Sequence, residues 1–285
     1  MVDFLLIDGH QLAFRCFYGV GELSRSDGFP TGALHGYIHS ILRMREEVRP
    51  RHTVVFFDHG RCLKRLQLLP TYKGQRAPMP ENMRLQLPHM REVVPLLGAV
   101  KIEREGTEAD DLLASLATRE SNRGKSSLIA SSDKDFAQLV CDRIKLHVPP
   151  ASRGGCGRWT AMDADAVEKK FGVRPQCIVD YLSLVGDSSD NIPGVPGVGA
   201  KTASEWLRLY GSIEGIRQHL GALSPRLAKN FLASEEILAR TRELIRFETA
   251  MDVPESDGEQ FDGHALKNFL RTFELDKLAS KFFLE

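Results

Sequence analysis

The chain has 285 residues, of which 42% are hydrophobic, 27% charged and 8% aromatic, which is typical of a soluble, globular protein able to bury a core. Lys and Arg together number 38, as do Asp and Glu, so the net charge of zero lacks the basic excess usual in nucleic-acid binders. No run of about 18 apolar residues occurs, so a membrane-spanning helix is not expected.

Short apolar segments predict buried strands, and amphipathic segments between them predict helices. The predicted strands are residues 4–7, 53–57, 127–130 and 144–148, and the predicted helices are 34–47, 109–120 and 136–140. This alternation indicates an α/β fold with a mostly parallel, twisted central sheet flanked by helices. Since the chain starts directly with a strand and has no basic leading region, a secretion signal is not expected.

The texture of the sequence changes after about residue 150. Residues 149–157 are rich in Pro, Gly and Ser and predict a surface loop, and the pattern is helical from residue 163 onward. Apolar residues at helical spacing within 233–247 predict a face that packs into the core. An acidic loop at 252–263 is expected to precede a last helix near 265–273.

The five cysteines are widely spaced and contain no C-x-x-C pair. A disulfide framework or a zinc site is therefore not expected, and a reducing, cytoplasmic environment fits best.

Acidic residues follow the ends of three predicted strands. Asp8 and Asp58 end the first two, and Asp133 and Asp135 follow the third within a few residues. Because the carboxyl ends of parallel strands meet at one edge of a sheet, these acids are expected to lie together. Ordinary turn and helix-cap chemistry explains any one of them equally well. Two further acidic clusters contain the remaining candidates, Glu108, Asp110, Asp111, Asp187 and Asp190.

Taken together, so many acids favour a cation site. Two like charges about 5 Å apart repel by roughly 3 kcal/mol at an effective dielectric constant of 20, so a pocket of acids is costly without cations. Oxygen ligands without Cys or His suit Mg²⁺ or Mn²⁺. Two such ions can promote phosphodiester hydrolysis by stabilising the attacking and leaving oxygens, and this chemistry needs no Ser/His/Asp triad.

A basic segment adds a second feature. Between residues 60 and 101 there are eight Lys or Arg residues and two Glu residues. Within it, Lys73 and Arg76 would share a face if they lay on a helix, and could hold a scissile phosphate. Tyr72 offers a surface on which a terminal base could stack. The alternative is an ordinary exposed helix start or solvated surface.

The glycine-rich stretch 191–202 is the strongest local signal. Its glycines and the helix start that follows allow backbone N–H groups to approach a phosphate. A nucleotide-binding P-loop is not expected, because Ala200 separates Gly199 from Lys201 and no strand precedes the stretch. A hairpin between helices that contacts one DNA backbone fits better. Its candidate contacts are Gly194, Gly197, Val198, Gly199, Lys201 and Thr202.

With these motifs assembled, the sequence resembles the 5′-nuclease and flap endonuclease superfamily, including the 5′→3′ exonuclease domain of bacterial DNA polymerase I. The matching motifs are YKGQR at 72–76, EADD at 108–111, DKD at 133–135 and GDSSDNIPGVPGVG at 186–199, and the last is highly specific. The resemblance is good over residues 1–215 and weaker beyond.

The resemblance implies a PIN-like nuclease core at 1–175 with a helical arch at about 60–100. It also implies a helical region at 176–285, with a helix–three-turn–helix at about 176–210 and C-terminal helices that pack on the core. The acids Asp8, Asp58, Glu108, Asp110 and Asp111 would surround a first metal, and Asp133, Asp135, Asp187 and Asp190 would build a second. Lys73 and Arg76 would flank the scissile phosphate.

The resemblance further implies two Mg²⁺ ions, replaceable by Mn²⁺, and a K⁺ in the helix–three-turn–helix. The expected substrate is DNA with a 5′ flap, nick or 5′ end, or an RNA primer strand in a hybrid, cut by a monomer in the bacterial cytoplasm at the nucleoid. The family usually has small residues where this chain has His10 and Gln11, and Gly where it has Ser132. A catalytically inactive DNA-junction-binding module and a PIN-type ribonuclease remain the alternatives.

Overall fold

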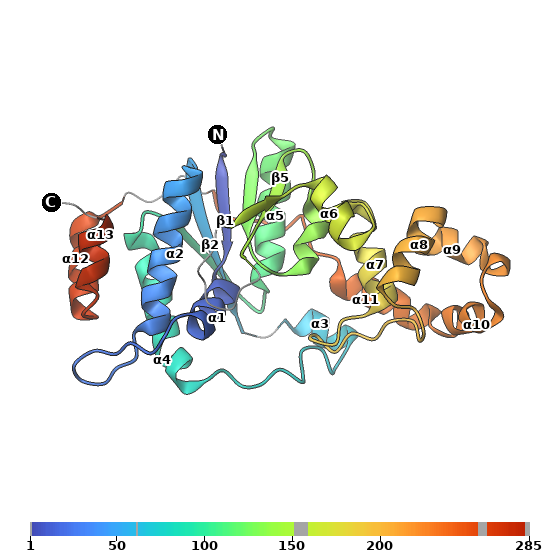
Figure 1. Cartoon of the computed structure of the whole chain (residues 1–285), viewed down its shortest axis with the longest axis horizontal. Coiled ribbons are helices and arrows are strands. Elements are labelled where there is room, and N and C mark those ends of the chain that lie inside the picture. The colour runs from blue at the N-terminus through green and yellow to red at the C-terminus, as the bar shows by residue number, and fades with distance from the viewer. Residues whose placement is uncertain (1, 61, 151–158, 256–260, 283–285) are drawn as a thin grey trace.

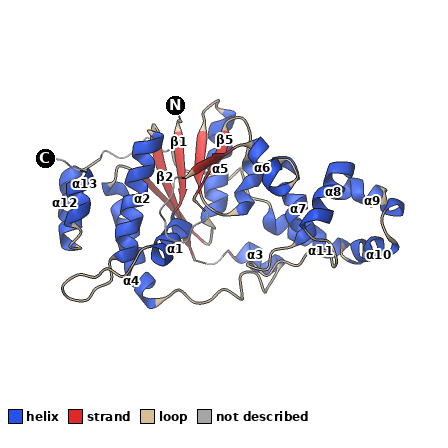
Figure 2. Cartoon of the chain, in the orientation of Figure 1, coloured by secondary structure: helices blue, strands red, loops and turns tan. Residues whose placement is uncertain are grey.

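The central element is a six-stranded sheet, within residues 2–60, 62–150, 159–255 and 261–282 that the computed structural model describes. Its strand order is β3-β2-β1-β4-β5-β6. Figure 2 shows the strands in red, with blue helices around them. The strands are β1 (Phe4–Asp8), β2 (His52–His59), β3 (Val100–Glu105), β4 (Ser127–Ala130), β5 (Ile144–Val148) and β6 (Thr160–Met162). β1 to β5 run parallel and β6 is antiparallel to β5, which confirms the predicted α/β sheet.

The parallel register brings the acidic strand ends to one edge of the sheet, the lower edge in Figure 1. Asp8 lies opposite Phe56 of β2, two residues before Asp58. On the other side of β1, β4 ends at Ala130, three residues before Asp133. The expectation that these acids share an edge is therefore confirmed.

Helices cover both faces of the sheet, so two hydrophobic cores form. The helices next to the sheet are α1 (Gly9–Gly19), α2 (Gly32–Val48), α4 (Glu81–Leu96) and α5 (Ala109–Asn122). Side chains of a strand alternate between faces. Leu6 and Phe56 accordingly pack in the core of α5, whereas Leu5, Ile7 and Phe57 pack in the core of α1, α2 and α4. Burial on both faces explains why the predicted strands are apolar throughout.

The helices predicted at 34–47 and 109–120 are confirmed as α2 and α5. The helix predicted at 136–140 is instead a 3-10 helix, η1 (Lys134–Leu139), because Asp133 caps a short turn directly after β4. β3 and β6 were not predicted. β3 is an edge strand with alternating charged residues, and β6 has only three residues at the opposite edge.

The expected arch at about 60–100 is narrower in the structure. α4 buries Met83, Met90 and Val94 in the core with α2, so residues 81–96 belong to the α/β body around the sheet. Only α3 (Leu63–Leu68) and the chain up to residue 80 lie outside it, and Figure 1 shows this chain running beneath the acidic edge. The apolar spacing of α4 identifies it as a core helix.

A helical region forms one end of the elongated molecule (Figure 1). Its elements are α6 (Ala164–Phe171), η2 (Pro175–Cys177), α7 (Ile178–Val185), α8 (Ala200–Tyr210), α9 (Ile213–Gln218), η3 (Leu220–Ala222), α10 (Pro225–Ala233) and α11 (Glu235–Ile245). The apolar face predicted within 233–247 belongs to α11, where Leu238, Leu244 and Ile245 are buried. The loop predicted at 149–157 lies outside the described residues from 151 onward.

α12 (Gly263–Thr272) and α13 (Asp276–Phe282) lie at the opposite end, where they pack on α4 and α2. The chain reaches them through residues 246–255, which cross α5; the rest of the predicted acidic loop, 256–260, lies outside the described residues. One face of α5 holds this crossing segment at four-residue intervals, through Asp111, Ser115, Arg119 and Arg123. No described helix has both the length and the apolar character needed to cross a membrane.

Candidate functional site

Asp8 and Asp133 are joined through Ser131 at the acidic edge. Asp8 caps α1 by accepting a hydrogen bond from Gln11 N at 3.0 Å, and it accepts another from Ser131 Oγ at 3.2 Å. Ser131 Oγ in turn accepts from Asp133 N at 3.0 Å, and Asp133 caps η1 through Asp135 N at 2.9 Å. The helix-cap interpretation is therefore correct for both acids, but capping alone does not require the two caps to meet.

Asp58 joins β2 to the beginning of α5. Its Oδ1 accepts from Ala109 N at 2.8 Å, which places the N-terminus of α5 beside the strand end. Its own N–H donates to His10 Nδ1 at 3.0 Å, and its carbonyl accepts from Arg91 Nη2 at 2.9 Å. His10, a departure from the family pattern, thus holds the backbone of a candidate ligand.

The electrostatics show that these acids lie together. Burial, with the negative charges of Asp58 and Asp133, raises the pKa of Asp8 to about 7. Burial, with Asp8 and Asp133, likewise raises the pKa of Asp110 well above its usual value. A raised pKa means that the surroundings disfavour the charged carboxylate, so each of these acids keeps its proton to a higher pH unless a cation takes the place of the proton.

A second group of acids comes from η1 and the turn after α7. Burial raises the pKa of Asp135 well above its usual value, and Asp133, Asp187 and Asp190 add to that rise. The pKa of Asp187 is lowered instead; burial opposes this, but hydrogen bonds from Ser189 and from Lys134, whose Nζ lies 3.0 Å away, outweigh it. Asp133 borders both groups, since Asp187 and Asp190 also help to raise its pKa after burial.

Lys73 and Arg76 both reach the acids, although they do not share a helix. Residues 70–75 form a turn in which Lys73 has a φ of 53°, so the helical interpretation is wrong. Lys73 Nζ lies 3.1 Å from Glu108 Oε1, and Arg76 Nη2 lies 2.5 Å from Asp190 Oδ1. Lys73 N also donates to the carbonyl of Asp190 at 3.1 Å, which docks this turn on the second acidic group.

Tyr72 is not available as a stacking surface in this arrangement. Its side chain is buried at 9% exposure, with its hydroxyl 3.3 Å from Glu108 Oε2 and Lys73 Nζ 5.0 Å from the ring centre. Tyr72 therefore packs under Lys73 and anchors the turn to Glu108. Because its ring is buried, it offers no free face for a terminal base, and the stacking prediction is not borne out.

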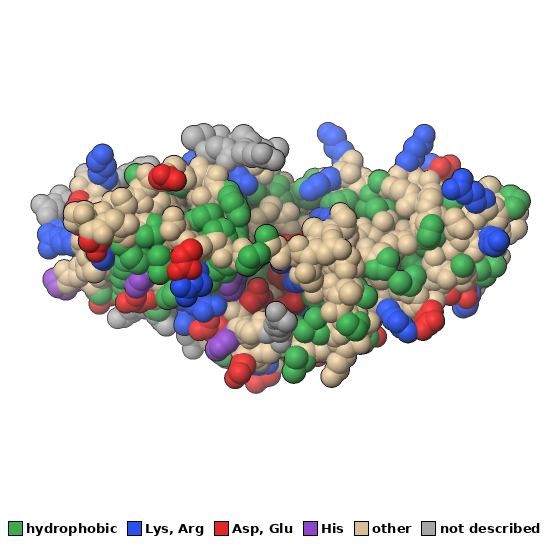
Figure 3. Space-filling view, turned by 90° about the horizontal axis from the view of Figure 1, so that it is seen from below, with side chains coloured by type: hydrophobic (Ala, Val, Ile, Leu, Met, Phe, Trp, Pro, Cys, Tyr) green, Lys and Arg blue, Asp and Glu red, His purple; other side chains and the backbone are tan. Residues whose placement is uncertain are grey.

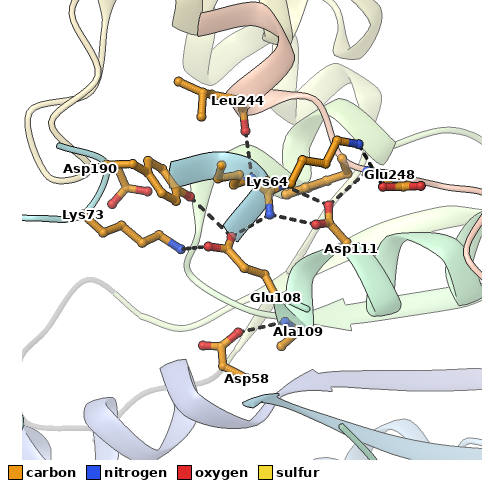
Figure 4. Close-up of polar contacts among 12 residues, drawn as sticks. Asp58, Lys64, Lys73, Glu108, Ala109, Asp111, Asp190, Leu244 and Glu248 are labelled. Atoms are coloured by element: carbon orange, nitrogen blue, oxygen red, sulfur yellow. Dashed lines mark hydrogen bonds and ion pairs between the residues drawn. The ribbon is translucent and has the colours of Figure 1, made fainter. Parts of the chain in front are cut away.

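Glu108 and Asp111 are held by a buried arginine (Figure 4). Arg65 Nη1 lies 2.7 Å from both Glu108 Oε2 and Asp111 Oδ2, and its Nη2 lies 2.9 Å from Asp111 Oδ1. Asp111 Oδ1 also accepts from Glu248 N at 3.0 Å. Both oxygens of Asp111 are thus engaged on the side of α5 that faces the crossing segment, so we correct its predicted role as a metal ligand.

The remaining acids fit hydrated divalent ions. Figure 3, which views the molecule from this edge, shows Asp and Glu side chains gathered in a hollow with Lys and Arg around it. Over the described ranges, no three His, Cys, Asp or Glu side chains are close enough to hold one ion between them, so an ion at this edge would be held partly through water. The assignment of acids to a first and a second metal stays a prediction. Mg²⁺ commonly retains several waters and uses one or two carboxylates with substrate phosphates, and this oxygen-only set suits that mode.

The glycine hairpin connects α7 and α8. A Cβ on Gly194 would lie 2.4 Å from the carbonyl of Val185, so this glycine is required for close packing against α7. The side chain of Val198 is buried and anchors the hairpin. We therefore correct these two predicted DNA contacts to structural roles. Gly197, Gly199 and Lys201 are exposed and Thr202 is half-exposed, at the N-terminal end of α8.

Three residues of the site were missed in the sequence. In the sequence, Arg65 is one of several basic residues of its segment, Ser131 belongs to none of the motifs, and Lys134 is simply the middle residue of the DKD motif. The involvement of Lys134 could have been predicted, because a lysine between Asp133 and Asp135 in one turn must lie near both acids. Nothing in the spacing of Arg65 or Ser131 pointed to their partners.

Comparisons with known proteins agree with this arrangement. A family model described as "5′-3′ exonuclease, N-terminal resolvase-like domain" matches residues 3–172, and one described as "5′-3′ exonuclease, C-terminal SAM fold" matches residues 173–265. The thermostable DNA polymerase I of Thermus thermophilus is 37% identical over 98% of this chain, which spans 33% of that protein. A 5′-3′ exonuclease of Aquifex aeolicus is 34% identical over 98% of this chain and 94% of its own length.

Solved structures share the fold. T5 5′-exonuclease with bound zinc ions has a TM-score of 0.74 at 23% identity, covering 95% of this chain and 98% of that one. The catalytic core of Rad2 in complex with DNA substrate has a TM-score of 0.64 at 13% identity, covering 99% and 92%. At these identities the likeness establishes the architecture alone.

Proposed function

This chain belongs to the 5′-3′ exonuclease family, and on that basis we propose that it is a metal-dependent, structure-specific 5′ nuclease. It hydrolyses phosphodiester bonds at or near DNA 5′ ends, as a 5′→3′ exonuclease and flap endonuclease. The observation that carries the proposal is the meeting of acids from β1, β2, α5, η1 and the turn after α7 at one edge, beside Lys73 and Arg76.

The proposed metal ligands, directly or through water, are Asp8, Asp58, Glu108, Asp110, Asp133, Asp135, Asp187 and Asp190. The raised pKa values of four of them, Asp8, Asp110, Asp133 and Asp135, and the oxygen-only chemistry of the whole set support Mg²⁺, with Mn²⁺ as a substitute. The T5 5′-exonuclease binds divalent ions. When bound, two such ions stabilise the attacking and leaving oxygens and activate the attacking water. A K⁺ in the hairpin is a further part of the proposal.

Lys73 and Arg76 bind the scissile phosphate in this proposal. Without substrate they are held by Glu108 and Asp190. A phosphate that enters the hollow offers each cation a new partner, while divalent ions replace the positive charge that leaves the acids. The side chains therefore move little and keep the phosphate beside the ions, which stabilises the charge that develops during cleavage.

The hairpin grips the duplex part of the substrate. Backbone N–H groups at the start of α8, together with Gly197, Gly199, Lys201 and Thr202, contact one phosphate backbone and read shape instead of sequence. The chain at 69–80, beneath the acidic edge, lies beside the 5′ single strand. The catalytic core of Rad2, which shares the fold, is solved in complex with DNA substrate, which supports DNA as the ligand of this fold.

The chain spans about a third of the length of the DNA polymerase I relatives that it matches, and nearly all of the Aquifex exonuclease. We propose that its substrates are 5′ flaps, nicks and 5′ ends, including RNA primer strands in hybrids. It would act as a monomer in primer removal and repair, in the bacterial cytoplasm at the nucleoid.

The test compares labelled 5′-flap DNA, nicked duplex and single-stranded RNA, each with Mg²⁺ and with EDTA. The proposal expects Mg²⁺-dependent cleavage near the flap junction and little cleavage of RNA. Binding without cleavage would favour the inactive junction-binding module. Preferential cleavage of RNA would favour the PIN-type ribonuclease.

A further inference from the structure

We propose that Arg65 is a positioning residue for Glu108. It holds one carboxylate oxygen, Oε2, in a fixed place, so that the other, Oε1, is oriented toward the metal site. The inference rests on the proposed nuclease function, because it concerns how Glu108 serves the same site. Arg65 lies in the basic segment beside the acidic edge, yet it is 5% exposed and cannot contact a nucleic-acid strand.

The guanidinium of Arg65 joins three separate parts of the chain. It lies on α3, it binds Glu108 and Asp111 at the beginning of α5, and its Nε donates to the carbonyl of Leu244 at the end of α11 at 3.2 Å. Arginine suits this position because its planar fork makes paired hydrogen bonds that a lysine cannot reproduce. Arg65 thereby fixes α3, from which the chain continues along the hollow, to the beginning of α5, where Glu108 and Asp110 lie.

The contacts of Glu108 are unequal on its two sides. Oε2 faces inward, 2.7 Å from Arg65 Nη1 and 3.3 Å from the hydroxyl of Tyr72. Oε1 faces Lys73, whose Nζ lies 3.1 Å away (Figure 4). The side chain of Arg65 is 7% exposed, whereas that of Lys73 is 23% exposed. The inner contact is therefore shielded from solvent, whereas the outer contact is accessible to an entering ion or phosphate.

The exchange has a direct consequence for metal binding. When Lys73 leaves Glu108, either for a phosphate or because an entering divalent cation displaces its ammonium group, Oε1 becomes free to contact the hydrated ion, while Arg65 keeps Oε2 in place. Without Arg65, the carboxylate can rotate and offer either oxygen, so ordering it becomes a cost of metal binding. Partners that orient a ligand in this way change metal affinity by about 10–100-fold when they are removed.

The first test is Arg65→Lys, which keeps the charge and loses the paired geometry. We expect the Mg²⁺ concentration for half-maximal flap cleavage to rise about tenfold, with flap binding in EDTA unchanged within about twofold. Mn²⁺ binding to the DNA-free protein, measured by calorimetry, is expected to weaken by a similar factor. The matched control is Arg119→Lys. Arg119 is another arginine of α5, but it binds the crossing segment at the carbonyl of Val253 and does not contact the acidic edge of the sheet.

A double variant covers the case in which Arg65→Lys does not fold. Arg65→Met with Asp111→Asn removes both charges of the buried pair and keeps an acceptor for Glu248 N, and it should show the same loss of metal affinity. A double-mutant cycle separates positioning from general destabilisation. In a Glu108→Gln background, Arg65→Lys should cause no further change in Mn²⁺ affinity.

Unchanged metal affinity in a folded Arg65 variant overturns the proposal. It is also overturned if Arg65→Lys weakens Mn²⁺ binding by the same factor in the Glu108→Gln background as in the wild-type background. The result is separable from the proposed function. If the wild-type protein fails to cleave any flap substrate, the nuclease proposal fails, yet the calorimetric Mn²⁺ titrations of the DNA-free variants still decide the role of Arg65.

Discussion

Two sets of acids share this site, and they differ in how their charge is neutralised. Asp8, Asp110 and Asp133 face one another at the strand ends, and burial with mutual repulsion raises their pKa values. We call these the uncompensated acids. The compensated acids each have a nearby cation: Glu108 and Asp111 have Arg65, Asp187 has Lys134, and Asp190 has Arg76.

This difference indicates that folding alone neutralises only one of the two sets of acids, and that the other set requires bound cations. The compensated acids fix the geometry of α5, the basic turn and the hairpin by internal ion pairs. The uncompensated acids create a negative potential that external cations relieve. Stability and catalysis should therefore respond in opposite ways when a member of each set is replaced.

The largest expected effect is on cleavage when an uncompensated acid is removed. Asp133→Ala should lower the rate of flap cleavage by more than about 10³-fold, because it lies between both acidic groups. Flap binding in EDTA should persist. Asp163→Ala is the matched control, since Asp163 caps α6 through Ala166 N at 3.0 Å but lies outside the site. Undiminished cleavage by Asp133→Ala would remove that residue from the proposed metal site.

The next largest effect concerns stability and compares two neighbours on α5. Asp111→Ala should lower the free energy of unfolding by about 3–5 kcal/mol, because it leaves Arg65 with an incomplete buried ion pair. Asp110→Asn should not lower it in EDTA at neutral pH, since an acid with a raised pKa destabilises its charged form. Urea unfolding monitored by circular dichroism measures both. Equal losses in the two variants would contradict the division into two sets.

A smaller effect is expected when the exchangeable cations are removed. Arg76→Met and Lys73→Met should each reduce the rate at saturating DNA by about 10²-fold, because each removes one contact to the phosphate. Arg84→Met is the control, since Arg84 is an exposed arginine of the same basic segment that pairs with Glu81. Single-turnover kinetics separate this loss from weaker binding. A change in binding alone would place the pair on the approach path of the DNA and not at the scissile phosphate.

Much of this arrangement could be predicted from the sequence. The apolar strand segments and the acids at their ends located the sheet and the acidic edge, because strand direction in a βαβ fold fixes where the ends lie. The sequence was less informative about neighbouring residues on one helix. Asp110 and Asp111 are adjacent and chemically identical, but their side chains leave α5 about 100° apart, so one meets Asp8 and the other meets Arg65.

Other misjudged features depend on contacts between distant segments. Tyr72 and Val198 belong to motifs typical of DNA binding, and only the packed structure shows that their side chains are buried. α4 falls within the basic segment, and its charged residues conceal an apolar face that packs into the core. The partners of Arg65 come from residues 43, 46 and 179 positions away, a separation that local patterns do not encode.

The smallest expected effect is a dependence of stability on pH in the absence of metal. The pKa of Asp8 is about 7 in the folded protein against an ordinary value of 3.8, so folding favours its protonated form. This contribution to stability is complete below about pH 4 and is lost as the pH rises to about 7, and roughly 1–3 kcal/mol of it is lost between pH 5 and pH 7. Urea unfolding in EDTA at pH 5, 6 and 7 should therefore show falling stability, with a shallower fall for Asp8→Asn. Mg²⁺ should also flatten the profile, because a bound cation stabilises the charged carboxylate in place of the proton.

An identical slope in the wild-type protein and Asp8→Asn would mean that Asp8 is already neutralised by the protein, and the distinction between the two sets of acids would fail at its central member.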